Sequence, residues 1–251
     1  MTAPRPTVTS LEIMPVYGQS ENRPRNDAPA IAAALDAVTA EQVYSTYGMT
    51  DTHGAMVGAN GAGLNSIDQD HPASGFATAA GAKQVSPAFT LQRARAARLR
   101  DAGLAAQGVV VADHGYGGRM IRAWRPADTS PLGRNQMFWM RESKRLADAF
   151  GVAISCPYTF LFQGTSAKDQ PGAAYRADFE AAHGATLQQA LDLFGAPPRL
   201  VVVVNGGDVN TLADLGETAG AQYRIALDHD GIIATWQRIY PIIDQNIHID
   251  G

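Results

Sequence analysis

The sequence of 251 residues contains a single cysteine, Cys156, so no intramolecular disulfide can stabilise the fold. Cys156 lies in the apolar run Val152–Phe162, where we expect a buried and unreactive thiol. Charge is also scarce, because charged residues make up 18% of the chain and the formal net charge is −4. The negative net charge supplies no electrostatic case for binding a phosphate backbone, and we expect no nucleic acid among the partners.

Long hydrophobic runs are missing as well. No apolar stretch approaches the roughly 18 residues of a membrane-spanning helix, and residues 1–7 lack the apolar core of a signal peptide. We expect a soluble protein without a membrane partner, in the cytoplasm or on a virion-like particle. Hydrophobic residues nevertheless make up 45% of the chain, which suffices for the core of one domain spanning residues 1–251.

Motifs of several other enzyme classes are absent. The chain has no Gly-x-Ser-x-Gly, which argues against an α/β-hydrolase. The glycine-rich stretch Gly54–Gly63 lacks the order of a dinucleotide-binding loop, so no cofactor is expected. Histidines and carboxylates do gather nearby, but their spacing matches no standard zinc or calcium loop; they are Asp51, His53, Asp68, Asp70 and His71. We therefore predict no metal site.

Apolar runs and helix-like segments alternate along the chain. The runs without polar alternation, which are typical of strands buried on both faces, are Leu11–Tyr17, Gly108–Ala112, Val152–Phe162 and Leu200–Asn205, with a weaker fifth at Ile232–Tyr240. The segments with helical spacing are Pro87–Ala102, Gln136–Phe150, Ala173–Phe194 and Ala219–Asp228. This order predicts the α/β class, as a sandwich around a mainly parallel five-stranded sheet. Residues 26–82 show little periodicity and are interpreted as a long insertion over the site.

Small and polar residues follow the ends of the predicted strands. These stretches are Gly18–Ser20, Asp113–Gly118, Gln163–Ser166 and Asn205–Asp208. Because parallel strands end at one edge of a sheet, the four stretches are expected to meet there and to form the binding site. Small residues at this edge let backbone N–H groups approach a substrate closely.

Ser20 is the leading candidate for a nucleophile. It follows an apolar run that ends in Gly18-Gln19, which is how a strand presents a serine on a loop. A serine needs a base to accept its proton and an acid to orient that base. Asp244 and His248, four residues apart near the other end of the chain, could supply both. The alternatives are a serine that merely ends a strand and a histidine at the surface.

Four short blocks resemble the SGNH hydrolases, in particular the branch of sialate and acetylxylan O-acetylesterases and their prophage relatives. The blocks are Tyr17-Gly-Gln-Ser20, Gly115–Trp124, Phe160–Ser166 and Asp244–His248. The resemblance implies an α/β/α sandwich of three layers, flavodoxin-like in topology. It also implies Ser20 as nucleophile, Asp244 and His248 as its partners, and an oxyanion hole formed by Ser20, Gly117 and the Gln163 amide.

The third block departs from the family pattern, since Thr165 stands where the family has an acidic residue. Gln19 and Trp124 within the blocks, and His114 beside the second block, are expected to contact the substrate. For Trp124 a place in the core is the alternative interpretation.

The resemblance implies a serine esterase that removes acyl groups, acetyl in the first place, from a carbohydrate. The alternative is a glycan-binding or structural module of a phage-like particle that keeps the hydrolase fold with little activity. In either case the partner is a glycan, and the chain could be a component of a larger protein or particle.

Overall fold

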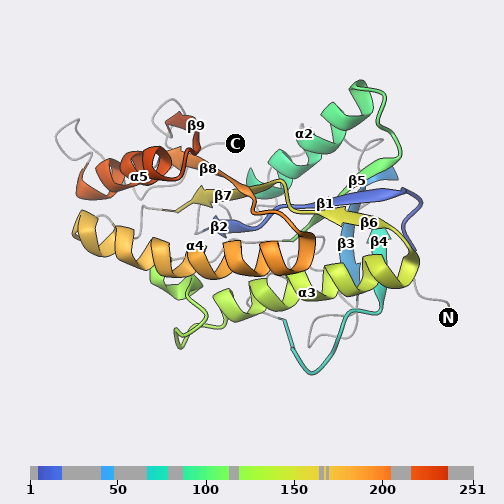
Figure 1. Cartoon of the computed structure of the whole chain (residues 1–251), viewed down its shortest axis with the longest axis horizontal. Coiled ribbons are helices and arrows are strands. Elements are labelled where there is room, and N and C mark those ends of the chain that lie inside the picture. Colours follow the sequence, from blue (N-terminus) through green and yellow to red (C-terminus); the bar gives the residue numbers. More distant parts are fainter. Residues whose placement is uncertain are drawn as a thin grey trace, which may run out of the picture.

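The computed structural model describes residues 5–18, 41–47, 67–78, 87–112, 119–163, 167, 170–204 and 216–236 (Figure 1). The strands in these ranges are β1 (Ser10–Ile13), β2 (Val16–Gly18), β3 (Val43–Tyr47), β4 (Gly75–Thr78), β5 (Gln107–Val111), β6 (Ala153–Ser155), β7 (Tyr158–Phe162), β8 (Arg199–Val204) and β9 (Ile232–Trp236). The helices are α2 (Pro87–Asp101), α3 (Leu132–Phe150), α4 (Gly172–Phe194) and α5 (Gly216–Asp228), with a 3-10 turn, η3, at Ile121–Trp124.

The strands form two hydrogen-bonded groups that continue one another. Their orders are β4-β3-β5-β1-β6 and β2-β7-β8-β9. Pro15 separates β1 from β2 and Pro157 separates β6 from β7, since proline has no N–H to donate to the ladder. The Pro15 carbonyl still accepts a hydrogen bond from the Phe160 N–H at 2.9 Å, so the two breaks lie side by side.

The prediction of one mainly parallel five-stranded sheet was wrong in detail. The five-stranded group is mixed, because β3 pairs with β4 in antiparallel orientation. The other pairings in that group, β1 with β5, β1 with β6 and β3 with β5, are parallel, as are all those of the four-stranded group. The α/β class itself is confirmed.

Part of the segment interpreted as an insertion belongs to the sheet. Strand β3 lies beside β5 with Val43 opposite Val109, and β4 is its edge partner with Phe76 opposite Thr46. Both strands are short, and the buried Ser45 and Thr46 interrupt the apolar pattern of β3. A short strand with polar buried residues gives too weak a period-two signal to be recognised from sequence.

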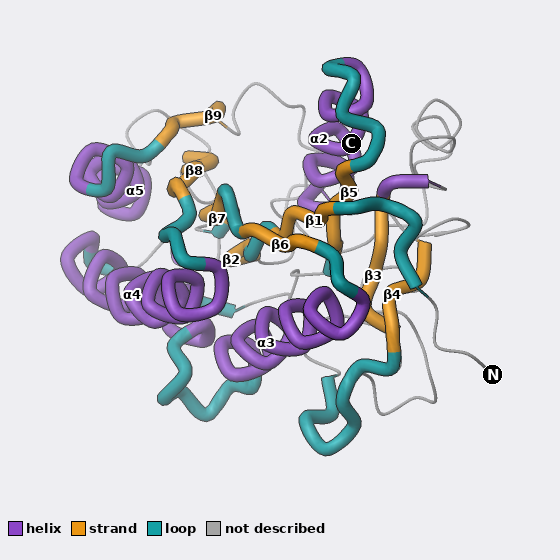
Figure 2. Tube along the Cα trace, turned by 45° about the vertical axis from the view of Figure 1, so that its right-hand side comes forward, coloured by secondary structure: helices purple, strands orange, loops and turns teal. Residues whose placement is uncertain are grey.

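Helices cover both faces of the sheet, and each face has its own core. On one face Ala96 and Leu99 of α2 pack with Val109 and Val111 of β5. Val110, which points the other way because side chains alternate along a strand, packs in the core under α3, α4 and α5. Figure 2 shows α2 on the side of the strands opposite to α3 and α4.

The predicted helices are confirmed, with two starting points displaced by several residues. Helix α5 begins at Gly216, three residues before the predicted Ala219. Helix α3 begins at Leu132, four residues before the predicted Gln136. It ends where Gly151 takes a left-handed conformation with φ 67°, and α4 ends in the same way at Gly195 with φ 78°. Among the described helices, none is long and apolar enough to cross a membrane.

Candidate active site

The carboxyl ends of the parallel strands define the edge where the site was predicted. Strands β2 and β7 run side by side, and the last residue of β2, Gly18, is opposite Phe162. Strand β1 lies between β5 and β6, so the chain order reverses there, and such a reversal is where open α/β sheets bind ligands. Ser20 follows Gly18 by two residues, and Gln163 follows Phe162 directly. The first and third sequence blocks therefore begin at neighbouring strand ends.

Most of the predicted site residues fall outside the described ranges. Strands β2, β5, β7, β8 and β9 lead within one or two residues into segments that the structure does not describe. The predicted residues in those segments are Gln19, Ser20, His114, Gly117, Asp244 and His248. Their roles remain predictions, and Gln163 and Trp124 are the two predicted residues whose surroundings can be examined.

Gln163 is fully buried, and its side chain connects two of the blocks. Its Nε2 donates a hydrogen bond to the carbonyl oxygen of Arg119 at 2.9 Å. Arg119 directly follows Gly118, so this bond joins the third block to the second. Within the described residues, the Oε1 atom of Gln163 has no hydrogen-bond partner. A buried polar atom in that state suits a side chain that is held for a ligand or for an adjoining loop.

Trp124 lies in the core and does not present its ring to a ligand. It is 1% exposed, and its ring meets that of Tyr17 edge to face, with centroids 5.9 Å apart. The expectation that Trp124 stacks on a sugar does not fit this burial, whereas the alternative interpretation as a core residue does. The apolar spacing of η3, with Ile121, Ala123 and Trp124 buried, explains why this turn faces inward.

A buried aromatic cluster supports β2 just before the predicted nucleophile loop. The Tyr17 hydroxyl lies 3.2 Å from Nδ1 of His183 on α4, and the His183 ring stacks on Phe179 with centroids 4.9 Å apart. The His229 ring packs edge-on against His183 at 5.1 Å, and its Nε2 lies 3.0 Å from the Glu180 carboxylate. Sequence reasoning missed this cluster, because a histidine inside a helix gives no signal of its partner.

Burial determines the ionisation of this cluster. Desolvation, with a smaller contribution from the neighbouring His229, lowers the pKa of His183 to about 3. Desolvation also raises the pKa of Tyr17 well above its ordinary value, against hydrogen bonds with Thr186 and Thr159 that lower it. Both groups are therefore neutral near pH 7. Burial likewise raises the pKa of the Cys156 thiol, which is 4% exposed, in line with the predicted unreactive cysteine.

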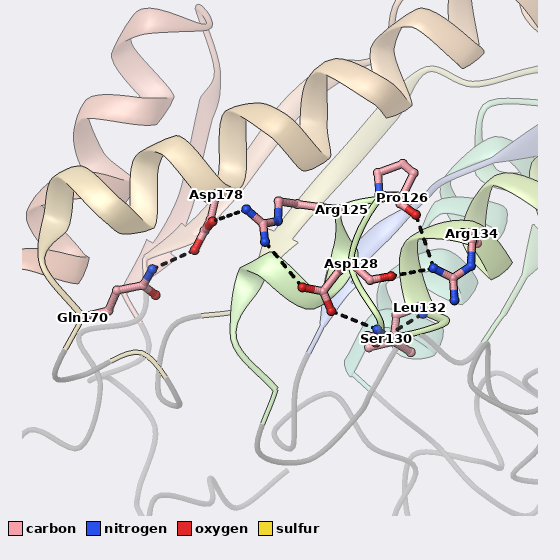
Figure 3. A network of polar contacts seen from close by, with 8 residues as sticks. All are labelled: Arg125, Pro126, Asp128, Ser130, Leu132, Arg134, Gln170 and Asp178. Carbon is pink, nitrogen blue, oxygen red and sulfur yellow. Dashed lines mark hydrogen bonds and ion pairs between the residues drawn. The ribbon is translucent and has the colours of Figure 1, made fainter.

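A polar network fixes the segment that follows the second block (Figure 3). Arg125 donates to Asp178 of α4 at 3.0 Å and to Asp128 at 3.4 Å. Gln170 donates to the other oxygen of Asp178 at 2.9 Å, so both segments leading to the edge are attached to α4. The pKa of Asp128 is lowered, mostly by the hydrogen bond from the Ser130 N–H and to a smaller extent by Arg125.

Helix α5 holds the segment that follows the third block. The Thr218 hydroxyl donates to the carbonyl of Ala167 at 2.8 Å, and the Glu217 carboxylate accepts the Gly172 N–H at 2.6 Å. Ala167 is fully buried, and its carbonyl accepts a second hydrogen bond from the Gln170 N–H at 2.9 Å. The described residues Ala167 and Gln170 are thus attached to α5 and α4, respectively.

The carboxylates and the histidine at residues 68–71, which belong to the group compared with metal-binding loops in the sequence, pair with one another. Asp68 Oδ2 lies 2.7 Å from Nδ1 of His71, and Asp68 Oδ1 accepts the Asp70 N–H at 2.9 Å. Both contacts lower the pKa of Asp68, and the hydrogen bond from the Asp70 N–H has the larger effect. In the described part of the chain no three such residues gather as a metal site.

Comparison of the chain with protein-family models and with curated proteins finds no match. The resemblance to the SGNH hydrolases therefore depends on the four sequence blocks, of which the structure describes parts of the first three.

Proposed function

We propose that this chain is a serine ester hydrolase of the SGNH type, with a three-layer α/β/α sandwich, that removes an acetyl group from a carbohydrate. The observation that carries the proposal is the convergence of three blocks at one sheet edge. The register places Gly18 opposite Phe162, and the Gln163 amide donates to the Arg119 carbonyl at 2.9 Å. Blocks that are far apart in sequence and carry complementary chemistry are what a shared active site requires.

The proposed reaction is acyl transfer in two steps. His248, oriented by Asp244, accepts the proton of the Ser20 hydroxyl while the oxygen attacks the ester carbonyl. The N–H groups of Ser20 and Gly117 and the amide of Gln163 stabilise the oxyanion, and the sugar hydroxyl leaves with the proton from His248. A water molecule then attacks the acyl-enzyme and gives its proton to His248, which passes it to the departing Ser20 oxygen, so acetic acid is released and Ser20 is restored.

The test is hydrolysis of p-nitrophenyl acetate and of an acetylated xylan by the wild-type chain and by Ser20→Ala. The variant should lose activity by at least about a thousandfold, and a serine-directed phosphonate should label the wild type alone. Ser10→Ala is a matched control, because Ser10 is the first residue of β1 and lies at the amino ends of the parallel strands, opposite to the edge of the proposed site. Full activity in Ser20→Ala would refute the assignment.

The second candidate is a glycan-binding module of a particle with little activity. It is favoured by Thr165 in place of an acidic residue, and by the Gln163 Nε2 group already donating to Arg119. Binding of acetylated glycan without acetate release, together with no phosphonate labelling, would establish this candidate over the esterase.

A further inference from the structure

Three fully buried polar groups meet at the end of β7. The main-chain carbonyl of Gln163 accepts hydrogen bonds from the Tyr175 hydroxyl of α4, at 3.1 Å, and from Nε2 of Gln222 of α5. Gln222 Nε2 also donates to the Tyr175 hydroxyl oxygen at 3.1 Å. Each of the three residues is 0% exposed. They come from three different elements, so the contact fixes the end of β7 against both helices.

The donors and acceptors in this triangle match. The Gln222 amide has two N–H groups, one for the Gln163 carbonyl and one for the Tyr175 oxygen. The tyrosine O–H supplies the second donor to that carbonyl, whose two lone pairs are then both occupied. A buried network in which the members are paired is rigid and selects one conformation. Burial raises the pKa of Tyr175, so the hydroxyl keeps its proton and remains a donor.

The same residue is anchored at its other end. While its main-chain carbonyl is fixed by α4 and α5, the Gln163 side chain reaches the Arg119 carbonyl with its amide. The main chain of Gln163 and the amide at the tip of its side chain are therefore both fixed. Neither Tyr175 nor Gln222 contacts the amide itself. Catalytic donors must be held to within a fraction of an ångström, because a misplacement of about 1 Å costs roughly a hundredfold in rate.

We propose that Gln222 and Tyr175 are positioning residues that set the Gln163 amide for the oxyanion of the ester hydrolysis, an inference that rests on the function proposed above. They act through the main-chain carbonyl of Gln163 and have no contact with the substrate. The hydrogen-bond triangle between β7, α4 and α5 is the observation that carries this inference.

The experiment measures kcat and KM for p-nitrophenyl acetate in Gln222→Met, Tyr175→Phe and Gln163→Met, and in the double variant Gln163→Met/Gln222→Met. Methionine has the length of glutamine but does not donate, and Tyr175→Phe removes one oxygen atom, so a folded variant is available if Gln222→Met fails to fold. We expect kcat to fall about 10-fold to 100-fold in Gln222→Met and Tyr175→Phe, with KM within about twofold.

The double variant and a control separate positioning from stability. With the Gln163 amide gone, Gln222→Met should lower kcat no further. Gln189→Met is the control, because Gln189 is a buried glutamine of α4 whose Nε2 donates to the Met137 carbonyl at 2.7 Å. It loses an equivalent bond away from Gln163, so its kcat should equal that of the wild type.

Each result is decisive. Unchanged kcat in Gln222→Met and Tyr175→Phe, with an active wild type and an inactive Ser20→Ala, would overturn the positioning role and leave the esterase in place. An equal fall of kcat in Gln189→Met, or additive losses in the double variant, would also overturn it. A wild type without ester hydrolysis would refute the proposed function and this inference together.

Discussion

Acidification should destabilise this protein in a pH range that identifies His183. The ring is 1% exposed and sits between the Tyr17 hydroxyl and the Phe179 ring, so the folded state holds it neutral. Its pKa falls from the ordinary 6.5 to about 3 on folding. Between these two values the unfolded chain binds a proton that the folded chain does not, and stability therefore decreases as the pH falls.

The magnitude follows from the shift. The contribution of His183 is fully present above about pH 6.5 and decreases by about 1.4 kcal/mol for each pH unit below it. Between pH 6.5 and pH 4.5 the folded state should lose about 3 kcal/mol from this residue. The carboxylate of Asp128 also loses its contribution on acidification, but at lower pH. Its pKa lies below the ordinary 3.8, so its contribution is lost only as the pH falls below that value.

The assay is urea unfolding, followed by circular dichroism, at several pH values from 7.5 to 4.5. Wild type and His183→Gln are compared, and the quantity of interest is the difference between their free energies of unfolding. Glutamine can still hydrogen-bond to Tyr17 but does not titrate, so this difference should shrink by about 3 kcal/mol on acidification. His71→Gln, at a ring that is 69% exposed, should retain the acid sensitivity. Parallel curves for wild type and His183→Gln would refute the reasoning.

Two further predictions concern Arg125 and Cys156. Arg125→Gln leaves Asp128 and Asp178 without their shared cation. Because Arg125 is 37% exposed, the free energy of unfolding should fall by only about 1 kcal/mol in urea titrations. No loss would show that the network of Figure 3 is energetically neutral. Cys156 is 4% exposed with a raised pKa, so a disulfide reagent should label the native chain on the order of a hundredfold more slowly than the chain unfolded in urea. Equal labelling rates would contradict the buried position.

The sequence predicted the elements whose signal is long and regular. Helices α2, α3, α4 and α5 match predicted segments to within four residues at each end, because each has more than ten residues of helical spacing. Strands β1, β2 and β5 to β9 were found because they lie in apolar runs, although two of these runs, Leu11–Tyr17 and Val152–Phe162, each form two strands. Strands β3 and β4 were not, since they have five and four residues and β3 buries Ser45 and Thr46. Their place is decided by tertiary pairing with β5.

Less of the candidate site could be predicted. The sequence indicated Gln163, but it gave no indication that Tyr175, eight residues before His183 on α4, and Gln222 on α5 would meet its carbonyl. Such contacts depend on how α4 and α5 pack, and a lone tyrosine or glutamine in a helix has no pattern that reveals its partner. Trp124 shows the reverse error, because a tryptophan beside a site motif looks the same in sequence whether it is buried or exposed.

Two helical glycines test how the segment after the second block is held. A Cβ added at Gly133, in the first turn of α3, would clash with the carbonyl oxygen of Trp124, whereas one added at Gly184 on the exposed side of α4 would meet nothing within 4 Å. Gly133→Ala should therefore destabilise the fold by about 3 kcal/mol or more.

Gly184→Ala should stabilise the fold by about 0.5–1 kcal/mol, because alanine suits a helix interior better than glycine. The same chemical change thus has opposite signs at the two positions, which urea unfolding can measure, and a common sign would contradict the close packing of α3 on η3. Because a displaced η3 would also move the nearby Arg119 carbonyl that holds the Gln163 amide, any folded Gly133→Ala should show a lower kcat for ester hydrolysis, while Gly184→Ala should not.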